Sequence, residues 1–341
     1  MKWNIVAPFF HAGEPNRWIN DSAPPSQHTF RKVPFSAGER QQSWHQRGSR
    51  GTPLLNWLDY WTTSGSALEG ADGVITLFPQ LALTTSIRRM LARRSSLPIV
   101  AWCFNLGRFP RGAPQSLART ALNGIQRFIV HSTAEVELIS DYLGIPQERV
   151  RFVPLQRAPI EIIEQEEKEA PFVIAMGSAN RDYATLAEAA RLTGLPVKIV
   201  ASKRCMEQID LPANVTFVSG LSPRQCYALA QRARFSIIPL TDTGVASGQV
   251  TVVEAQRMRS PVIATNTIGT RDYIEHGETG LLVLPGDSRG LANAMLSMWH
   301  DENRRAYFAE SSDAFARTHL SDEAAGKALV RVLNEVTHAR A

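Results

Sequence analysis

The sequence predicts an α/β protein made of two doubly wound domains, each built on a parallel sheet. The first observation is length, because 341 residues exceed what one ordinary core accommodates and fit two domains of usual size. The second is a repeated alternation of short apolar runs, glycine-bearing turns and helical segments, which is typical of parallel strands with loops at their carboxyl ends. The composition, 44% hydrophobic and 20% charged, is that of a soluble globular protein.

Residues 1–158 are predicted to form the first domain. Its expected strands are short apolar runs bounded by turns, at residues 1–10, 29–35, 73–78, 98–104, 127–132 and 150–154. Its expected helices cover 53–68 and 81–94, and a third begins near Ser132. The polar stretch 36–52 has neither periodicity and is interpreted as a mobile loop of the kind that covers an active site.

The acidic segment 161–169 indicates a linker over residues 159–170, followed by a second domain over 171–320. The expected strands of this domain are apolar runs at residues 171–177, 197–201, 214–219, 235–240, 261–265 and 281–284. The run 178–186 is expected to enter a first helix, and further helices are expected at 223–233, 250–259, 288–299 and 302–318. A last helix is expected within residues 321–341.

The stretch 237–287 contains the strongest candidate for a binding site. A small-residue loop over 243–249 leads into the helix 250–259. Such a loop presents unpaired backbone N–H groups and the positive end of the helix dipole, so a phosphate is the expected guest. The expected backbone donors are Ser247, Gly248, Gln249 and Val250. Glu254, one turn further on, can accept hydrogen bonds from two sugar hydroxyls at once.

The same stretch resembles a known enzyme family in the order and spacing of its residues. The matching positions are Glu254-Ala255, Pro-Val-Ile-Ala-Thr at 261–265, Gly269, Gly277, Gly280 and the run 281–287. They resemble the retaining glycosyltransferases of family 4, the glycosyl transferases group 1 enzymes. The resemblance is strong over 172–290, moderate over 127–155 and 291–338, and slight over 1–125. It implies the GT-B fold, in which two Rossmann-like domains face a central cleft and the last helix crosses back to the first domain.

The resemblance implies that the second domain binds a nucleotide-sugar donor. Family members bind the donor diphosphate with an Arg and a Lys after the first strand of this domain, where Arg181 takes the Lys position and Ser178 the Arg position. Gly177 ends that strand, and Lys203 at the mouth of the next strand is expected to supply the second cation. Arg181 and Glu254 are therefore the residues to which we assign the reaction.

Two departures from the family concern the donor sugar and the acceptor. Ala246 stands where the family has the Glu that contacts the donor sugar, and the family's His-Asp pair after the strand 98–104 is missing. On the acceptor side, the loops that follow the strands 1–10 and 98–104 contribute His11, Gly13 and Asn105.

A retaining enzyme of this family needs no metal ion, because loop amides, a helix dipole and basic side chains neutralise the departing diphosphate. The sequence has no Asp-x-Asp motif, and we expect neither a metal nor a cofactor beyond the nucleotide-sugar substrate, whose base, uracil or guanine, stays open. An inverting enzyme would instead need a base in the first domain. The candidates for that base are His11, Glu14, Asp21, His28 and His45.

The basic charge is confined to the first half of the chain. Residues 1–155 carry 17 Lys and Arg against 10 Asp and Glu, whereas the remainder carries 20 against 22. The excess is either solvated surface charge or a surface for an anionic membrane or acceptor, and the four arginines within 81–94 leave the same two alternatives. Nucleic acid is not an expected partner, because no stacking module or helix-turn-helix signature is present.

Three cysteines without CxxC spacing indicate a reducing compartment and neither zinc nor disulfides. The N-terminus lacks the features of a signal peptide, so a cytoplasmic protein is expected, with peripheral attachment to the inner membrane face left open. The predicted function is transfer of a sugar from a nucleotide sugar to a glycan, glycolipid or lipid-linked acceptor. The alternative is a catalytically silent GT-B protein that binds a nucleotide or glycan as a regulator or scaffold.

Overall fold

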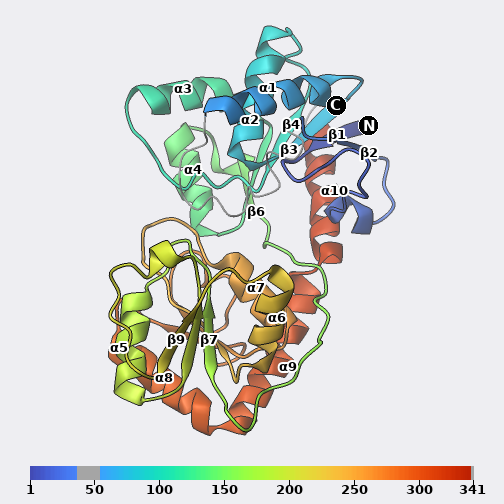
Figure 1. Ribbon diagram of the computed structural model, residues 1–341. Helices are drawn as coiled ribbons and strands as arrows, with labels where there is room; N and C mark the ends of the chain where they lie inside the picture. Colours follow the sequence, from blue (N-terminus) through green and yellow to red (C-terminus); the bar gives the residue numbers. More distant parts are fainter. Residues whose placement is uncertain (37–53, 339–341) are drawn as a thin grey trace. The chain divides into compact units, whose positions relative to one another are not determined.

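The computed structural model describes residues 1–36 and 54–338. Nearly all of the predicted loop at 36–52 therefore lies outside the described residues, as does His45. The chain divides into two compact units (Figure 1). Unit 1 comprises Met1–Pro154 and Asp322–Ala341, and unit 2 comprises Leu155–Ser321. Each unit is described by itself below.

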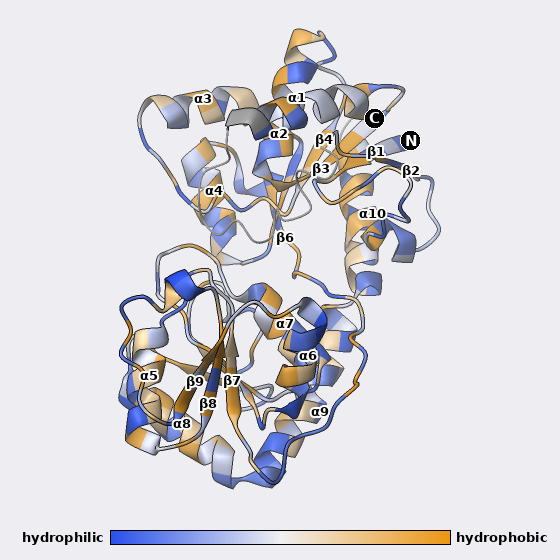
Figure 2. Ribbon diagram, viewed as in Figure 1, coloured by the Kyte–Doolittle hydropathy of each residue, from blue (hydrophilic) through white to orange (hydrophobic). Residues whose placement is uncertain are grey.

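Unit 1 contains a parallel sheet with the strand order β2-β1-β3-β4-β5-β6. Its strands are β1 (Lys2–Val6), β2 (Thr29–Val33), β3 (Gly73–Leu77), β4 (Ile99–Trp102), β5 (Arg127–Val130) and β6 (Val150–Phe152). The central strands β3 and β4 are buried along their whole length. Figure 2 shows them as hydrophobic, as expected for strands that helices cover on both faces.

One face of this sheet packs against α1 (Leu54–Leu68), α2 (Phe78–Leu91), α3 (Ala113–Leu122) and α4 (Ala134–Leu143). The other face packs against α10 (Asp322–His338), which also contacts the short 3-10 helix η1 (Ile19–Ser22). At Gly326 of α10 an added Cβ would lie 2.8 Å from the Cα of Ala23, so glycine permits this close approach. The last helix thus packs on the first unit, as the fold class predicts.

Unit 2 contains a second parallel sheet, with the strand order β12-β11-β10-β7-β8-β9. Its strands are β7 (Val173–Met176), β8 (Val197–Val200), β9 (Val215–Val218), β10 (Ser236–Ile238), β11 (Val262–Thr265) and β12 (Leu281–Val283). Helices α5 (Tyr183–Thr193) and α8 (Ser288–His300) cover one face. The other face carries α6 (Pro223–Arg232), α7 (Gln249–Arg257) and the second half of α9 (Glu302–His319).

Two helices differ from the prediction. Helix α2 begins at Phe78, directly after β3, because Phe78 adopts a left-handed φ of 70° and turns the chain at once. Helix α3 was not predicted, although Ala118, Ala121 and Leu122 recur at helical spacing, and Ala121 and Leu122 are buried while Leu117 is exposed. Two further 3-10 turns are η4 (Gln147–Arg149) and η5 (Lys203–Cys205). Within the described ranges, none of the helices combines the length and apolar character needed to cross a membrane.

Candidate functional site

The candidate site lies in unit 2, where the direction of the chain connections changes. Strand β7 is flanked by β10 and β8. The chain leaves β7 toward α5 on one face of the sheet and leaves β10 toward α7 on the other. Such a switch point opens a crevice at the carboxyl ends of the two strands, where ligands bind in open α/β sheets. The two loops meet there, because Arg181 and Leu240 form an antiparallel bridge and Thr241 N donates to Asn180 O at 3.0 Å.

Arg181 reaches from the β7 loop to the first turn of α7. Its Nε donates to Met176 O at 3.0 Å, and one Nη donates to Ala179 O at 2.9 Å. The other Nη donates to Thr251 Oγ1 at 2.8 Å. Burial lowers the pKa of Arg181, and the residue makes no ion pair with any other described residue. A partly buried cation beside the positive end of a helix lacks a counter-charge, so an anion is the ligand that would stabilise it.

Gly177 makes room for that guanidinium group. It has a φ of +118°, and an added Cβ would lie 2.4 Å from an Nη of Arg181. The carbonyl of Gly177 accepts a hydrogen bond from Tyr183 Oη at 2.6 Å. The geometry therefore gives Gly177 the role of positioning Arg181. The sequence had instead placed Gly177 itself among the donor-binding residues.

The loop before α7 presents a row of backbone donors. Gly248 is the N-cap of α7, with a left-handed φ of 88°. The N–H groups of Ser247, Gly248, Gln249 and Val250 have no acceptor elsewhere in the described chain. Gln249 and Val250 are the first two residues of α7. The side chain of Gln249 is buried and that of Val250 is exposed. Four unpaired N–H groups at a helix N-terminus could hold an anion together with Arg181.

Gly269 supports this loop from the next strand connection. An added Cβ at Gly269 would lie 2.1 Å from the carbonyl oxygen of Ser247, so only glycine permits the contact. Ala246, at the position of the family's sugar-binding Glu, is buried with 5% of its surface exposed. This point of the loop therefore carries a buried methyl group in place of the family's carboxylate.

Lys203 lies on η5, after β8, and is exposed. Ser202 N donates to Ser178 Oγ at 2.9 Å, and Cys205 Sγ donates to Ser178 O at 3.3 Å. These two bonds tie the β8 loop to the β7 loop. The side chain of Lys203 has no hydrogen bond or ion pair within the described ranges, so it is accessible beside the β7 loop.

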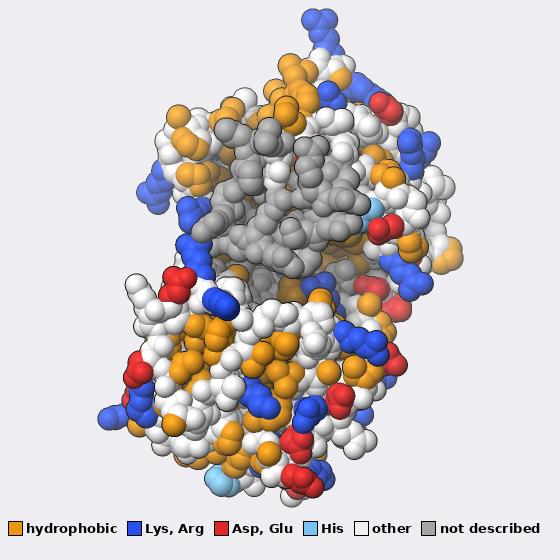
Figure 3. Space-filling model, in the orientation of Figure 1, with side chains coloured by type: hydrophobic (Ala, Val, Ile, Leu, Met, Phe, Trp, Pro, Cys, Tyr) orange, Lys and Arg blue, Asp and Glu red, His pale blue; other side chains and the backbone are white. Residues whose placement is uncertain are grey.

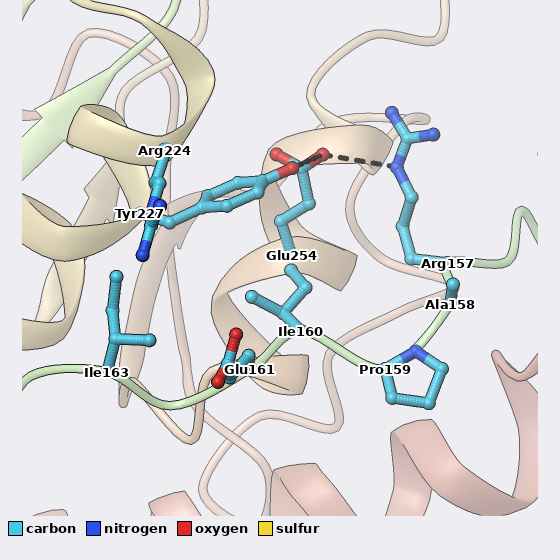
Figure 4. Close-up of a pocket in the computed structure, with 9 residues that line it drawn as sticks. All are labelled: Arg157, Ala158, Pro159, Ile160, Glu161, Ile163, Arg224, Tyr227 and Glu254. Atoms are coloured by element: carbon cyan, nitrogen blue, oxygen red, sulfur yellow. Dashed lines mark hydrogen bonds and ion pairs between the residues drawn. The ribbon is translucent and has the colours of Figure 1, made fainter.

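Glu254 is held by two side chains that the sequence did not identify (Figure 4). Tyr227 of α6 donates its hydroxyl to Glu254 Oε1 at 3.0 Å. Arg157 places its Nε 3.2 Å from the same oxygen. Burial raises the pKa of Glu254, while the charge of Arg157 and the bond from Tyr227 act in the opposite direction. Burial and the neighbouring carboxylate raise the pKa of Tyr227 to about 12, so the phenol stays a donor near neutral pH.

This cluster borders a cavity of about 690 Å³ that lies wholly within unit 2. The cavity is lined by the segment 157–161, by Ile163, Arg224, Tyr227 and Glu254 (Figure 4). Its walls combine aliphatic side chains with two arginines, a phenol and two carboxylates. No sequence spacing could reveal Arg157 and Tyr227, because they lie 97 and 27 positions from Glu254.

The candidate residues of the acceptor side lie in loops of unit 1. Asn16 Oδ1 accepts from the backbone N of His11 at 2.8 Å, and Asn16 Nδ2 donates to His11 O at 2.7 Å. Gly13 lies in the same turn, with a φ of 81°. Asn105 Oδ1 accepts from Gly107 N at 2.9 Å. The bonds of His11 fix its main chain, and the side chain of Asn105 stabilises its own loop.

Two of the candidate bases are held in structural contacts. Asp21 pairs with Lys32 at 2.5 Å. His28 accepts from Trp3 Nε1 at Nδ1, at 3.2 Å, and its Nε2 lies 2.9 Å from Asn334 Oδ1 of α10. His28 therefore joins β1 to α10, which is a packing role.

A His–Cys pair that the sequence did not predict lies at the carboxyl ends of β4 and β5. His131 Nδ1 is 2.7 Å from Val153 O, and Nε2 is 3.1 Å from Cys103 Sγ. Because a carbonyl only accepts, Nδ1 carries the proton, and Nε2 accepts from the thiol. Burial lowers the pKa of His131 to about 4. Cys103 adopts a φ of 53°, an unfavourable conformation for a residue with a Cβ.

In the part of the chain that the structure describes, no three His, Cys, Asp or Glu side chains are grouped so that they could hold a metal ion.

Comparison with known proteins covers part of this site, namely Lys203, the loop before α7 and Glu254, but neither Arg157 nor Arg181. Residues 201–314 match the family described as glycosyl transferases group 1. A trehalose phosphorylase from Grifola frondosa is 38% identical over 95 residues, which are 28% of this chain and 12% of that enzyme. The lipopolysaccharide core biosynthesis glycosyltransferase LpsE of Rhizobium meliloti (strain 1021) is 27% identical over 208 residues, which are 58% of each chain. The chain thus spans less than two-thirds of either relative.

The fold of the whole chain matches solved structures. The Anabaena protein HepE in complex with UDP superposes with a TM-score of 0.68 at 18% identity, covering 98% of this chain and 100% of that chain. At this level of identity the match shows the fold. The predicted GT-B fold is confirmed, and so is the resemblance to glycosyl transferases group 1.

Proposed function

Residues 201–314 belong to the glycosyl transferases group 1 family, and from this premise we propose that the chain is a glycosyltransferase that uses a nucleotide-sugar donor. The observation that carries the proposal is the combination of groups at the switch point of unit 2. A guanidinium without a counter-ion and four unpaired N–H groups form an anion site. A carboxylate follows on the same helix, in the second turn of α7.

These groups fit the parts of a nucleoside diphosphate sugar. The diphosphate would take the N-terminus of α7 and Arg181, with Lys203 as a second cation on the neighbouring loop. The ribose would present its two adjacent hydroxyls to Glu254, which can accept both. That HepE was solved in complex with UDP supports a nucleotide as the ligand of this fold.

We propose that transfer proceeds with retention and without a metal ion. The bond between the anomeric carbon and the diphosphate oxygen breaks, and the acceptor oxygen bonds to the same face of that carbon. The acceptor hydroxyl gives its proton to the departing diphosphate. Helix dipole, loop amides and Arg181 would stabilise the negative charge that develops on this leaving group.

The proposed acceptor is a glycan, a glycolipid or a lipid-linked sugar bound at the loops of unit 1 that contain His11, Gly13 and Asn105. LpsE is named for lipopolysaccharide core biosynthesis, which supports a saccharide on a lipid as acceptor. Such an acceptor would require the protein to work at a membrane surface on the cytoplasmic side.

The end of α2 is the proposed contact with an anionic membrane. Three of its four arginines are used inside unit 1: Arg88 stacks on Trp61, Arg89 donates to Leu97 O and Gly124 O, and Arg94 donates to Ala71 O. These three therefore serve packing. Met90 and Leu91 are exposed beside Arg93, and Figure 3 shows apolar and basic side chains together at this tip. An exposed apolar pair next to a cation is the pattern of an interfacial contact.

Sedimentation with vesicles tests this contact. Vesicles containing anionic lipid should retain the protein, and vesicles of neutral lipid should not. Replacement of Leu91 and Arg93 by Ser should abolish retention, whereas Arg317→Ser on the exposed face of α9 should not. Equal retention on both kinds of vesicle would contradict the proposed membrane contact.

The enzymatic proposal is tested with a panel of UDP- and GDP-linked sugars, with and without lipid extracts. Release of free nucleotide from one donor is the expected result, and Glu254→Ala should abolish it. Arg191→Ala, on the far side of α5, is the matched control and should retain the activity. If no donor is cleaved with or without acceptor extracts, the chain is not this enzyme.

The silent alternative draws on one observation, the buried Ala246 in place of a carboxylate. A silent protein would bind a nucleotide and leave every sugar donor intact. The same panel separates the two functions when binding and nucleotide release are both measured.

A further inference from the structure

The contact between Arg157 and Glu254 has a consequence for nucleotide affinity. We propose that Arg157 competes with the ribose hydroxyls for Glu254 and so determines how tightly, and how selectively, a ribonucleotide binds. This inference rests on the proposed function, because it takes Glu254 as the acceptor for the ribose.

The competition follows from the number of hydrogen bonds that a carboxylate can accept. Each oxygen accepts about two. Glu254 Oε1 accepts a hydrogen bond from Tyr227 Oη at 3.0 Å. The same oxygen forms an ion pair with Arg157, whose Nε lies 3.2 Å away, so the approach of a further donor to Oε1 is blocked. Oε2 has no hydrogen bond to the described chain. Two adjacent hydroxyls reach a carboxylate best when each oxygen takes one of them. A ribose can therefore bind in this way only after one donor leaves Oε1.

Arg157 is the donor that can leave. Its side chain is 43% exposed, whereas that of Glu254 is 17% exposed. Only its Nε faces the carboxylate, and both Nη atoms point away from it (Figure 4). The backbone of Arg157 stays in place, because its N donates to Leu320 O at 3.0 Å. Rotation of the side chain is therefore enough to free Oε1.

Tyr227 is the donor that stays. Its ring is partly buried on α6, and its pKa of about 12 keeps the hydroxyl protonated. When Arg157 has turned away, Oε1 has one free acceptor position beside the Tyr227 bond and Oε2 has two. This arrangement matches a vicinal diol.

The competition should depend on the number of ribose hydroxyls. A 2′-deoxyribonucleotide has a single hydroxyl on this edge of the sugar, which Oε2 can accept while Arg157 stays bound. Removal of the Arg157 side chain should therefore raise the affinity for the ribonucleotide and leave the affinity for the deoxyribonucleotide unchanged. A half-exposed ion pair is worth roughly 1 kcal/mol, which corresponds to about a fivefold change in affinity.

Calorimetric titration with UDP, GDP and their 2′-deoxy forms tests the proposal at pH 8. Arg157→Gln should bind the preferred ribonucleotide about threefold to tenfold more tightly than the unmodified protein does. Its affinity for the deoxy form should stay the same. Arg191→Gln is the matched control, since its side chain is 44% exposed and ion-paired in unit 2, and it should change neither affinity. Arg157→Met, with a side chain of similar reach and no charge, should repeat the result if Arg157→Gln is unstable.

The possible outcomes are distinct. Equal affinities of Arg157→Gln and the unmodified protein, or equal gains for the ribo and deoxy forms, overturn the competition and leave the proposed function intact. Weaker binding by Arg157→Gln also overturns it, because Arg157 would then bind the nucleotide directly. If no nucleoside diphosphate binds to the unmodified protein or to either variant, the proposed function itself fails.

Discussion

Burial of His131 should make the stability of unit 1 depend on pH. The pKa of His131 falls from an ordinary 6.5 to about 4 in the folded protein. Between these values the unfolded chain binds a proton that the folded chain does not. The free energy of unfolding therefore has its full value above pH 6.5 and decreases as the pH falls toward 4. At 1.36 kcal/mol for each pH unit, the loss amounts to about 3 kcal/mol.

Urea unfolding followed by tryptophan fluorescence measures this loss, because six of the seven tryptophans lie in residues 1–154. His131→Gln should lower stability at pH 7.5 by about 1–3 kcal/mol, since the Val153 carbonyl loses its best donor. The variant and the unmodified protein should approach each other near pH 4. His300→Gln, at an exposed position on α8, should leave the pH dependence unchanged. A His131→Gln variant with the unmodified protein's slope between pH 6.5 and 4 would refute the reasoning.

Three further predictions concern the candidate site and the last helix. Tyr227→Phe should raise the pKa of Glu254 further, because a donor to the carboxylate is lost, and the pH profile of nucleotide binding should move to higher pH; an unchanged profile would contradict the role of Tyr227. Gly269→Ala should displace the Ser247 carbonyl, because the added Cβ would lie 2.1 Å from the carbonyl oxygen. Calorimetry should then show weaker nucleotide binding, and circular dichroism should show that the protein stays folded. Gly326→Ala should lower the free energy of unfolding by about 1–3 kcal/mol, because its Cβ would lie 2.8 Å from Ala23 Cα; urea unfolding measures this, and an unaltered midpoint would show that α10 packs differently.

Much of the fold was predictable because its strands are short apolar runs between turns. The strands and most helices of both units occur where the periodicity placed them, and the parallel α/β class is confirmed. Boundaries moved where a backbone conformation decides them, as at Phe78. Helix α3 was missed although Ala118, Ala121 and Leu122 follow a helical period, because three of its apolar residues are alanines and its apolar face is narrow.

The candidate site was predictable only in its local parts. The loop before α7 and Glu254 belong to one continuous stretch, so spacing alone brings them together. Arg157 and Tyr227 reach Glu254 through tertiary packing, which no spacing records. The same holds for His131 and Cys103, which lie on two different strand ends. The roles of Arg181, Lys203 and Glu254 in donor binding stay predictions until a ligand is measured.

Titration of the unmodified protein and of Glu254→Ala with UDP and GDP tests the central claim most directly. The account predicts saturable binding of one of these nucleotides at a single site. It also predicts that Glu254→Ala weakens this binding by at least about tenfold, since each hydrogen bond to a charged group contributes about 1.5–3 kcal/mol. Equal binding by both proteins, or no binding by either, would contradict the assignment of this site to a nucleotide.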